Sequence, residues 1–169
     1  MSYRNKTYVI FDGDNDMWAY ARMKGWKALE NIDFNFYDAH DLNPLTKQAS
    51  NEQYIKQRLL ERMNNAKQVI VLIGGSTKNL YRFVRWELDQ ALSMKLPIIA
   101  INLNNSRRID EALCPSILKL QNCVHIAFRM RMIRHALDNF PPFFKSIKPT
   151  EKKNWYYEDK VYSDLGISN

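Results

Sequence analysis

The sequence predicts an α/β protein of three layers, in which a five-stranded, mostly parallel sheet carries helices on both faces. Short segments rich in β-branched and aromatic residues alternate with segments of helical periodicity, which is typical of βαβ units. Residues 69–73, with the sequence VIVLI, are apolar at every position, as expected for a strand that is covered on both sides. A length of 169 residues suits a single domain of this kind.

The first part of the chain predicts two strands, a helix and a long loop. Residues 7–11 form an apolar, β-rich segment that stops at the acidic loop 12–16. Residues 17–29 then repeat apolar side chains at helical spacing. A second strand is expected over residues 35–38, and residues 39–50 lack any periodicity and are expected to form a loop. The apolar residues of the first helix are Trp18, Ala21, Met23, Trp26 and Leu29.

The middle of the chain predicts a helix, the central strand and another helix. Ser50 is expected to cap a helix over residues 51–64, whose inward side chains are Tyr54, Ile55, Leu59 and Met63. The strand over residues 69–73 ends at Gly74-Gly75-Ser76-Thr77. A helix over residues 81–94 follows, with Val84, Leu88 and Ala91 on one stripe.

The last part of the chain completes the sheet and adds a tail. Strands are expected over residues 97–101 and 124–127, followed by a helix over residues 131–139 that Pro141-Pro142 ends. Five strands of this kind indicate a flavodoxin-like order of 2-1-3-4-5. Residues 1–140 are therefore predicted to form the domain. Residues 141–169 are predicted to be a C-terminal tail that docks on it without setting the fold.

The net charge of +7 is unevenly placed. Seven basic residues lie between residues 129 and 153, against two acidic ones. Such a stretch suits an anionic partner, but a solvated helix face followed by a polar tail explains it as well. No aromatic residues are interleaved there in an RNA-binding pattern, so we expect no nucleic-acid partner.

Several function classes are excluded by composition. No apolar run approaches the roughly 20 residues that span a bilayer. The first six residues are polar with no apolar region behind them, so a cytoplasmic protein is expected. Cys114 and Cys123, with only His125 nearby, are too few for a zinc site, and no metal or bound cofactor is expected.

Polar residues follow two of the predicted strands where a ligand would bind, at the carboxyl edge of the sheet. Asp12, Asp14 and Asp16 come after the first strand and would form a polar floor for Mg²⁺ or for ribose hydroxyls. Alternatively, Asn15 or Asp16 caps the first helix and the other carboxylates are solvated. The Gly-Gly-Ser turn at residues 74–76 offers backbone amides to a phosphate, or is a tight turn and no more.

A phosphorylatable receiver domain also carries acidic residues after its first strand. That chemistry needs an aspartate at the end of the third strand, whereas this strand ends at Ile73-Gly74. The receiver interpretation therefore lacks its central residue.

Glu87 is the other candidate for chemistry. On a helix that begins near Tyr81, it lies at the border of the buried face, flanked by the aromatic residues Phe83 and Trp86. A carboxylate in that place is partly desolvated. The alternative is an exposed helical glutamate that pairs with Arg85.

Five segments, in this order, carry a family resemblance: YVIFDGDND at residues 8–16, FYD at 36–38, VIVLIGGST at 69–77, FVRWE at 83–87 and PII at 97–99. Together they resemble the TIR-like domain family of the bacterial Thoeris anti-phage defence proteins, ThsB. The resemblance covers roughly residues 7–116. It implies a flavodoxin-like, TIR-like fold that cleaves NAD⁺ and makes a cyclic ADP-ribose-type signal.

The resemblance also assigns roles to residues. It implies that Glu87 is the essential glutamate and that the loop 39–50 corresponds to the mobile loop with which TIR domains assemble. The substrate-binding residues expected are Phe11, Asp12, Asp14, Asn15, Ser76 and Trp86. The implied partners are NAD⁺ as substrate, a downstream effector that senses the product, a phage-derived trigger and a second copy of the chain.

This chemistry matches the residue types. Breaking the bond between nicotinamide and ribose builds positive charge on the sugar, which a nearby carboxylate stabilises. Cyclisation needs a dry pocket with aromatic walls, for which Phe11, Trp18 and Trp86 are candidates. Many TIR domains are adaptors, so the alternative function is a non-catalytic signalling or scaffold module that self-assembles through residues 39–49.

Overall fold

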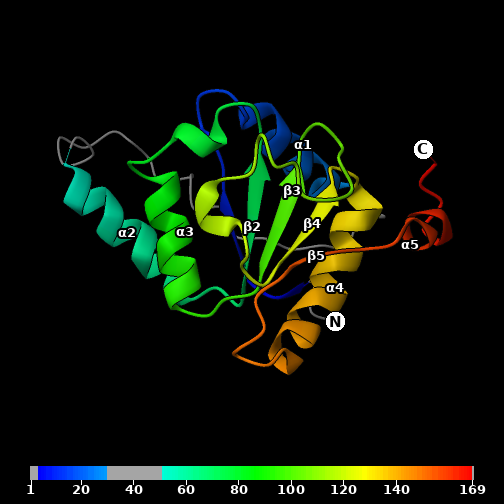
Figure 1. Cartoon of the computed structure of the whole chain (residues 1–169). Helices are drawn as coiled ribbons and strands as arrows, with labels where there is room; N and C mark the ends of the chain where they lie inside the picture. Colours follow the sequence, from blue (N-terminus) through cyan, green and yellow to red (C-terminus); the bar gives the residue numbers. More distant parts are fainter. Residues whose placement is uncertain (1–3, 30–50, 169) are drawn as a thin grey trace.

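A computed structural model describes residues 4–29 and 51–168 of the chain. In these residues, five strands form one sheet in the order β1-β2-β3-β4-β5, and every neighbouring pair is parallel (Figure 1). The predicted α/β class with a parallel sheet is confirmed. The strands are β1 (Thr7–Ile10), β2 (Gln68–Ile73), β3 (Ile98–Asn102), β4 (Cys123–Ala127) and β5 (Asn154–Tyr156).

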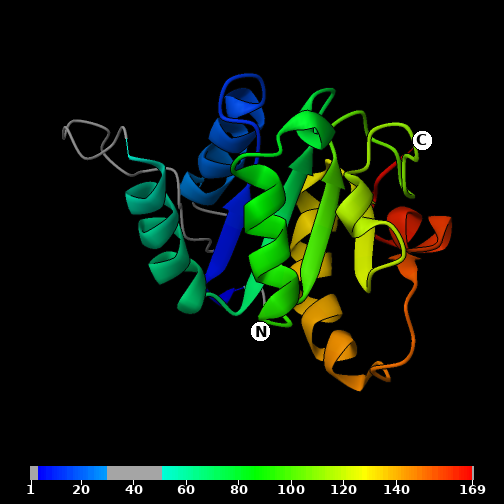
Figure 2. The ribbon, with the colours of Figure 1, turned by 60° about the vertical axis from the view of Figure 1, so that its left-hand side comes forward.

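Helices cover both faces of the sheet, which gives the three layers expected from the sequence. Helices α2 and α3 pack on one face, and α1, α4 and α5 pack on the other (Figures 1 and 2). The helices are α1 (Met17–Ala28), α2 (Glu52–Asn64), α3 (Val84–Ser93), α4 (Met130–Ser146) and α5 (Asp159–Asp164), with two 3-10 turns, η3 (Thr77–Asn79) and η4 (Ser116–Leu118).

The side chains of the strands alternate between two apolar clusters. In β2, Ile70 and Leu72 face α1 and α4, whereas Val69, Val71 and Ile73 face α2 and α3. Every residue of β2 is buried, as the unbroken apolar run predicted. Because all strands are parallel, their carboxyl ends lie at one edge of the sheet, and the loops after β1 and β2 meet there.

The predicted second strand, residues 35–38, and the loop 39–50 lie outside the described residues. The other four predicted strands correspond to β1, β2, β3 and β4 in the expected neighbour order. The fifth strand of the described sheet, β5, comes from the segment that the sequence analysis took for a docked tail.

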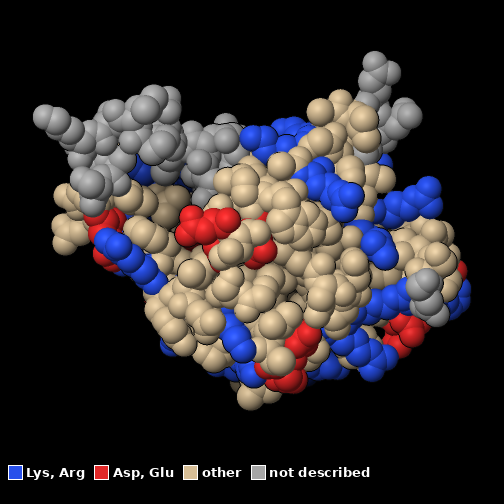
Figure 3. Space-filling model, turned by 90° about the horizontal axis from the view of Figure 1, so that it is seen from above, with Lys and Arg blue, Asp and Glu red and all other residues tan. Residues whose placement is uncertain are grey.

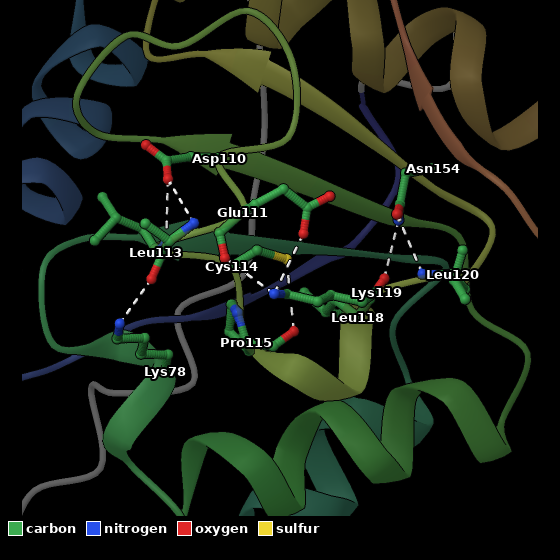
Figure 4. Close-up of polar contacts among 11 residues, drawn as sticks. Lys78, Asp110, Glu111, Leu113, Cys114, Pro115, Leu118, Lys119, Leu120 and Asn154 are labelled. Atoms are coloured by element: carbon green, nitrogen blue, oxygen red, sulfur yellow. Dashed lines mark hydrogen bonds and ion pairs between the residues drawn. The ribbon is translucent and has the colours of Figure 1, made fainter.

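Asn154 anchors β5 at the edge of the sheet. Its side chain accepts a hydrogen bond from Leu120 N at 3.1 Å and donates to the carbonyl of Leu118 at 2.9 Å (Figure 4). It also donates to the carbonyl of Gln121 at 3.2 Å. The backbone of β5 pairs with β4 from Cys123↔Asn154 to His125↔Tyr156. Residues 141–169 therefore do set part of the fold, and the expectation that they only dock on it was wrong.

Helix α4 continues through the two prolines that were predicted to end it. It runs from Met130 to Ser146, so the predicted domain boundary between residues 140 and 141 falls inside a helix. Each proline removes an N–H donor, but the apolar face extends past both of them. Phe140 and Pro141 are buried and Phe144 packs on the same cluster, so burial of this face favours the continuous helix.

Two local predictions need correction. In α1 the buried residues are Ala19, Tyr20 and Met23, whereas Trp18, expected on the apolar stripe, is half exposed. The N-cap of α2 is Asn51 rather than Ser50, because the Asn51 side chain accepts a hydrogen bond from Gln53 N at 3.0 Å. Over residues 4–29 and 51–168, none of the helices has the length and apolar character needed to cross a bilayer.

Candidate functional site

Asp12 joins the two loops at the carboxyl edge of the sheet. It lies two residues after β1 and is buried, and its carboxylate accepts four hydrogen bonds. Oδ1 accepts from the backbone of Asp14 and Asn15 at 3.0 and 3.3 Å. Oδ2 accepts from Asn15 Nδ2 at 2.7 Å and from Ser76 Oγ at 2.9 Å. Since Ser76 follows β2, this carboxylate fastens the two loops together.

These bonds determine what Asp12 can do. Burial acts to raise its pKa, but the hydrogen bonds from Asn15, Ser76 and the backbone outweigh it and hold the pKa below the usual value. A carboxylate has about four lone-pair sites, and all of them are occupied here. Asp12 is therefore placed to shape the loop, and the groups left at the surface are those of its neighbours.

We call Asp12, Asp14, Asn15 and Ser76 the strand-end rim. Asp14 and Asn15 are exposed and Ser76 is half buried. Asn15 Nδ2 also lies 3.2 Å from Ser76 Oγ, so the polar groups of the two loops are directly adjacent. Figure 3 looks onto this edge and shows acidic side chains among mostly uncharged atoms, with basic side chains gathered towards one side of the face.

Asp16 lies beneath this rim. Asp16 occupies the N-cap position of α1, as expected, but its side chain makes no capping hydrogen bond. Instead, Asp16 Oδ2 lies 3.5 Å from Thr77 Oγ1, which also accepts a hydrogen bond from Gly74 N at 2.9 Å. Burial, and then the charge of Asp12, raise the pKa of Asp16 above its usual value.

The aromatic residues at this edge differ in exposure. Phe11 is buried and stacks on Tyr20 with ring centroids 4.8 Å apart, so its ring belongs to the core beneath the rim. Trp18 is 50% exposed at the start of α1 and meets Phe128 edge-on at 5.6 Å. Of these two candidates for an aromatic wall, only Trp18 offers an open ring surface.

Glu87 lies on the other side of the sheet, in the first turn of α3. Its exposed fraction is 1%, so it is more deeply buried than the border position expected from the helical spacing. The hydroxyl of Tyr8, a buried residue of β1, donates a hydrogen bond to Glu87 Oε2. Burial raises the pKa of Glu87 to about 8, and the Tyr8 hydrogen bond opposes part of this rise. The alternative of an exposed glutamate paired with Arg85 was wrong.

Trp86 precedes Glu87 and is half buried between α3 and α2. The Lys56 ammonium of α2 lies 5.5 Å from the centroid of its ring, within the range of a cation–π contact. Trp86 therefore helps to pack α3, the helix of Glu87, against α2.

The structure brings together only part of the predicted site. Asp12, Asn15 and Ser76 are joined by hydrogen bonds, and Asp14 is joined to Asp12 through its backbone. Within residues 4–29 and 51–168, no hydrogen bond links Glu87 to this rim. Tyr8 lies four residues before Asp12, which corresponds to about 13 Å along an extended strand. The rim and the Tyr8–Glu87 pair thus lie at different levels along β1.

Tyr8 is the residue that the sequence analysis missed. Its ring alternates with Val9 along β1, so it reads as one more core residue. The sequence did carry one indication: a tyrosine in a buried strand usually has a hydrogen-bond partner for its hydroxyl. The partner, however, lies 79 residues away in the sequence.

Two further observations limit the chemistry of the described residues. Their His, Cys, Asp and Glu side chains form no group of three that would suit a metal ion. A shallow depression, open to solvent, lies between η3, the start of α3 and Pro115, and its lining includes Lys78 and Arg85. None of the predicted site residues lines it, and Lys78 is engaged with the carbonyl of Ala112 at 2.7 Å.

Comparison with known proteins adds one match. The model of a protein family described as "Thoeris protein ThsB, TIR-like domain" matches residues 8–108. The matched range is more than half of the chain and contains Tyr8, Glu87 and the whole strand-end rim. No curated protein matches the chain.

Proposed function

Because the chain belongs to the family of TIR-like domains of the Thoeris protein ThsB, and so to a defence system, we propose that it cleaves NAD⁺. The products are nicotinamide and an ADP-ribose signal of the cyclic type. NAD⁺ is the substrate rather than a resident cofactor, and Glu87 is the catalytic residue. The observation that carries the proposal is the burial of this carboxylate in an apolar layer, hydrogen-bonded by Tyr8 alone among the described residues.

The reaction breaks the bond between the ribose C1′ and the nicotinamide nitrogen. The bonding electrons go to the nitrogen, so nicotinamide leaves as a neutral molecule and needs no proton. Positive charge develops on the ribose, and a carboxylate stabilises it most strongly where water is excluded. Capture of the ribosyl cation by water gives ADP-ribose and a proton, whereas capture by a nucleophilic atom of the adenosine part gives the cyclic product.

The protonation state of Glu87 also favours this substrate. With a pKa raised to about 8, Glu87 is mostly protonated at neutral pH and ionises above that value. The nicotinamide ring of NAD⁺ is a cation, and a nearby cation favours the charged form of a carboxyl group. Binding of NAD⁺ next to Glu87 therefore draws the proton off and creates the carboxylate that the reaction needs.

The strand-end rim supplies the polar contacts of the proposed site. Asp14, Asn15 and Ser76 offer exposed or half-buried polar groups for ribose hydroxyls, and Asp12 holds them in place. Phe11 supports the loop from the core, and Trp86 closes the site on the α2 side. Since the rim and Glu87 lie at different levels, NAD⁺ spans the distance between them, and access to Glu87 requires α3 or the loop before it to move.

The product acts on a separate partner. We propose that the ADP-ribose signal is sensed by a downstream effector in the cytoplasm, and that a phage-derived trigger and association of the chain with itself control the activity. A buried catalytic group in the resting state agrees with such control.

The test is nicotinamide release from NAD⁺ by the wild type and by Glu87→Gln. Both proteins are assayed at rest and in lysate from infected cells, because activation is part of the proposal. Asp89→Asn is the matched control, since it removes a carboxylate from an exposed position of the same helix. We expect Glu87→Gln to lose at least 100-fold in rate while Asp89→Asn stays within twofold. Equal turnover by wild type and Glu87→Gln would falsify the catalytic role.

A further inference from the structure

We propose that Tyr8 is a positioning residue for Glu87: its hydroxyl fixes one oxygen of the carboxylate and leaves the other to face the reacting ribose. This inference rests on the proposed function, because it assigns Glu87 the chemical step. It adds a residue of β1 to a site whose other members follow the strands or lie on α3.

The placement of Tyr8 supports this role. It lies in β1, where its register partner is Val69 of β2, and its side chain enters the apolar cluster under α2 and α3. Both Tyr8 and Glu87 are 1% exposed. Their hydrogen bond therefore forms where water does not compete, and a hydrogen bond of this kind orients its partners more strongly than one at the surface.

The hydrogen bond from Tyr8 engages one of the two carboxylate oxygens of Glu87. Oε2 accepts from the Tyr8 hydroxyl, and Tyr8 is the only side-chain donor to the Glu87 carboxyl group in the described part of the chain. In the described residues, the Tyr8 hydroxyl bonds to Oε2, and no hydrogen bond joins another residue to Oε1. A carboxylate held at one oxygen has a defined direction for the other, and such alignment is what a reacting centre requires.

The same contact favours the charged form of Glu87. A hydroxyl that donates to a carboxylate stabilises the anion, whereas burial destabilises it. The charged and titratable groups around the pair are few. Tyr8 faces Glu87 from β1, Arg62 acts on Tyr8 from α2, and on α3 Arg85 and Asp89 are exposed. Tyr8 is thus the one titratable group among the described residues that shifts the pKa of Glu87.

Tyr8→Phe tests the inference, because it removes the hydroxyl and keeps the buried ring. Tyr162→Phe is the matched control. The Tyr162 hydroxyl is also buried and accepts a hydrogen bond from Ala127 N at 3.0 Å, but it lies in the cluster on the opposite face of the sheet. Loss of a buried tyrosine hydroxyl is therefore common to both variants, and only one of them touches Glu87.

Two measurements are made on the full-length proteins. The first is the pH dependence of nicotinamide release between pH 6 and 10. For Tyr8→Phe we expect kcat to fall about tenfold with KM within twofold, and the acidic limb of the profile to move up by about one pH unit. Tyr162→Phe should keep the wild-type profile. A Tyr8→Phe profile that matches the wild type overturns the inference.

The second measurement does not depend on turnover. The infrared carboxyl band of Glu87, identified as the band that Glu87→Gln lacks, is titrated in each protein. Its midpoint should rise by about one pH unit in Tyr8→Phe and stay unchanged in Tyr162→Phe. An unchanged midpoint in Tyr8→Phe overturns the inference whatever the enzyme does. If the midpoint moves but Glu87→Gln turns over NAD⁺ normally, the contact stands and the proposed function fails.

Discussion

The backbone of Gly74 passes directly over the carboxylate of Asp16. A β-carbon added to Gly74 would lie 2.3 Å from Asp16 Oδ2 and 2.6 Å from Oδ1, closer than any real contact. Gly74 follows β2 and Asp16 precedes α1, so this approach holds the loop after β2 against the start of the first helix. Asp12 and Ser76 of the strand-end rim lie in these same two loops.

Gly74→Ala should therefore destabilise the protein. The new methyl group meets a carboxylate that is itself buried, and overpacking of this kind costs about 1–3 kcal/mol. Gly75→Ala is the control, because a β-carbon there meets nothing within 4 Å. The free energies of unfolding of both variants are measured by denaturant titration.

A double mutant identifies the cause. If the clash with Asp16 is responsible, Gly74→Ala should cost less in an Asp16→Ala background than in the wild type. Equal costs in the two backgrounds, or equal costs for Gly74→Ala and Gly75→Ala, would show that the close approach does not matter.

Asp12→Ala should loosen the strand-end rim. It removes the acceptor of four hydrogen bonds, from Asp14, Asn15 and Ser76, and should lower the free energy of unfolding by about 2–3 kcal/mol. The effect should be smaller in acid, because the depressed pKa of Asp12 stabilises the fold only while the carboxylate is ionised.

Asp14→Ala separates structure from binding at the same rim. Its side chain is exposed, and only its backbone N–H bonds to Asp12, so stability should change by less than about 0.5 kcal/mol. A loss of stability in Asp14→Ala as large as in Asp12→Ala would contradict the role given to the Asp12 carboxylate. A rise in the KM for NAD⁺ in Asp14→Ala alone would place Asp14 at the substrate.

Glu87 should make the protein less stable as pH rises. Its pKa is raised from 4.5 to about 8 in the folded chain, so between these values the folded protein holds a proton that the unfolded chain has lost. The stabilisation present below pH 4.5 should therefore be lost as pH rises through 8, with a total on the order of a few kcal/mol. Unfolding free energies over this range measure it.

Glu87→Gln removes this dependence and keeps the shape of the side chain. The difference between wild type and Glu87→Gln isolates Glu87, because His125 is common to both. Burial lowers the pKa of His125 to about 4, so it acts in the opposite sense and destabilises the fold as pH falls below about 6.5. Parallel pH profiles for the two proteins would mean that Glu87 does not hold its proton.

A chain that ends at residue 140 should not fold cooperatively. It lacks β5, whose Asn154 bonds to three backbone groups near η4, and it lacks Tyr162, which is fully buried. The edge of β4 would be left open, and an open edge invites aggregation. Thermal unfolding and soluble yield of the shortened chain, beside the full chain, measure this. A cooperative transition like that of the full chain would restore residues 141–169 to the role of a docked tail.

Much of the fold was predictable because its signals are local. Residues 69–73 are apolar throughout, and β2 is buried throughout; the stripe of Val84, Leu88 and Ala91 is the buried face of α3. Strand β5 escaped prediction because it has three residues, half-buried to exposed, and no alternation to detect. The continuation of α4 past Pro141 was not predicted, because two consecutive prolines locally indicate the end of a helix. The packing of Phe140 and Phe144 on the apolar cluster outweighs that signal.

The candidate site was predictable in its location but less so in its contacts. The polar residues after β1 and β2 lie together at the carboxyl edge, as parallel strands require. Which of these polar side chains is already hydrogen-bonded within the protein could not be predicted. The neighbours Asp12 and Asp14 have the same side chain, yet one accepts four hydrogen bonds and the other is exposed, and no spacing rule separates them.

The sequence by itself determined the α/β class and the family, because periodicity and motif order are properties of neighbouring residues. The family resemblance then made Glu87 the candidate for chemistry. Only the tertiary structure decided that Glu87 is fully buried, that Tyr8 donates to it and that Asp16 lies under Gly74. Tyr8 and Glu87 are 79 positions apart in the sequence, and Asp16 and Gly74 are 58 positions apart. The charge, pKa and freedom of a side chain depend on what packs against it in space, and that is set only when the sheet and its helices are assembled.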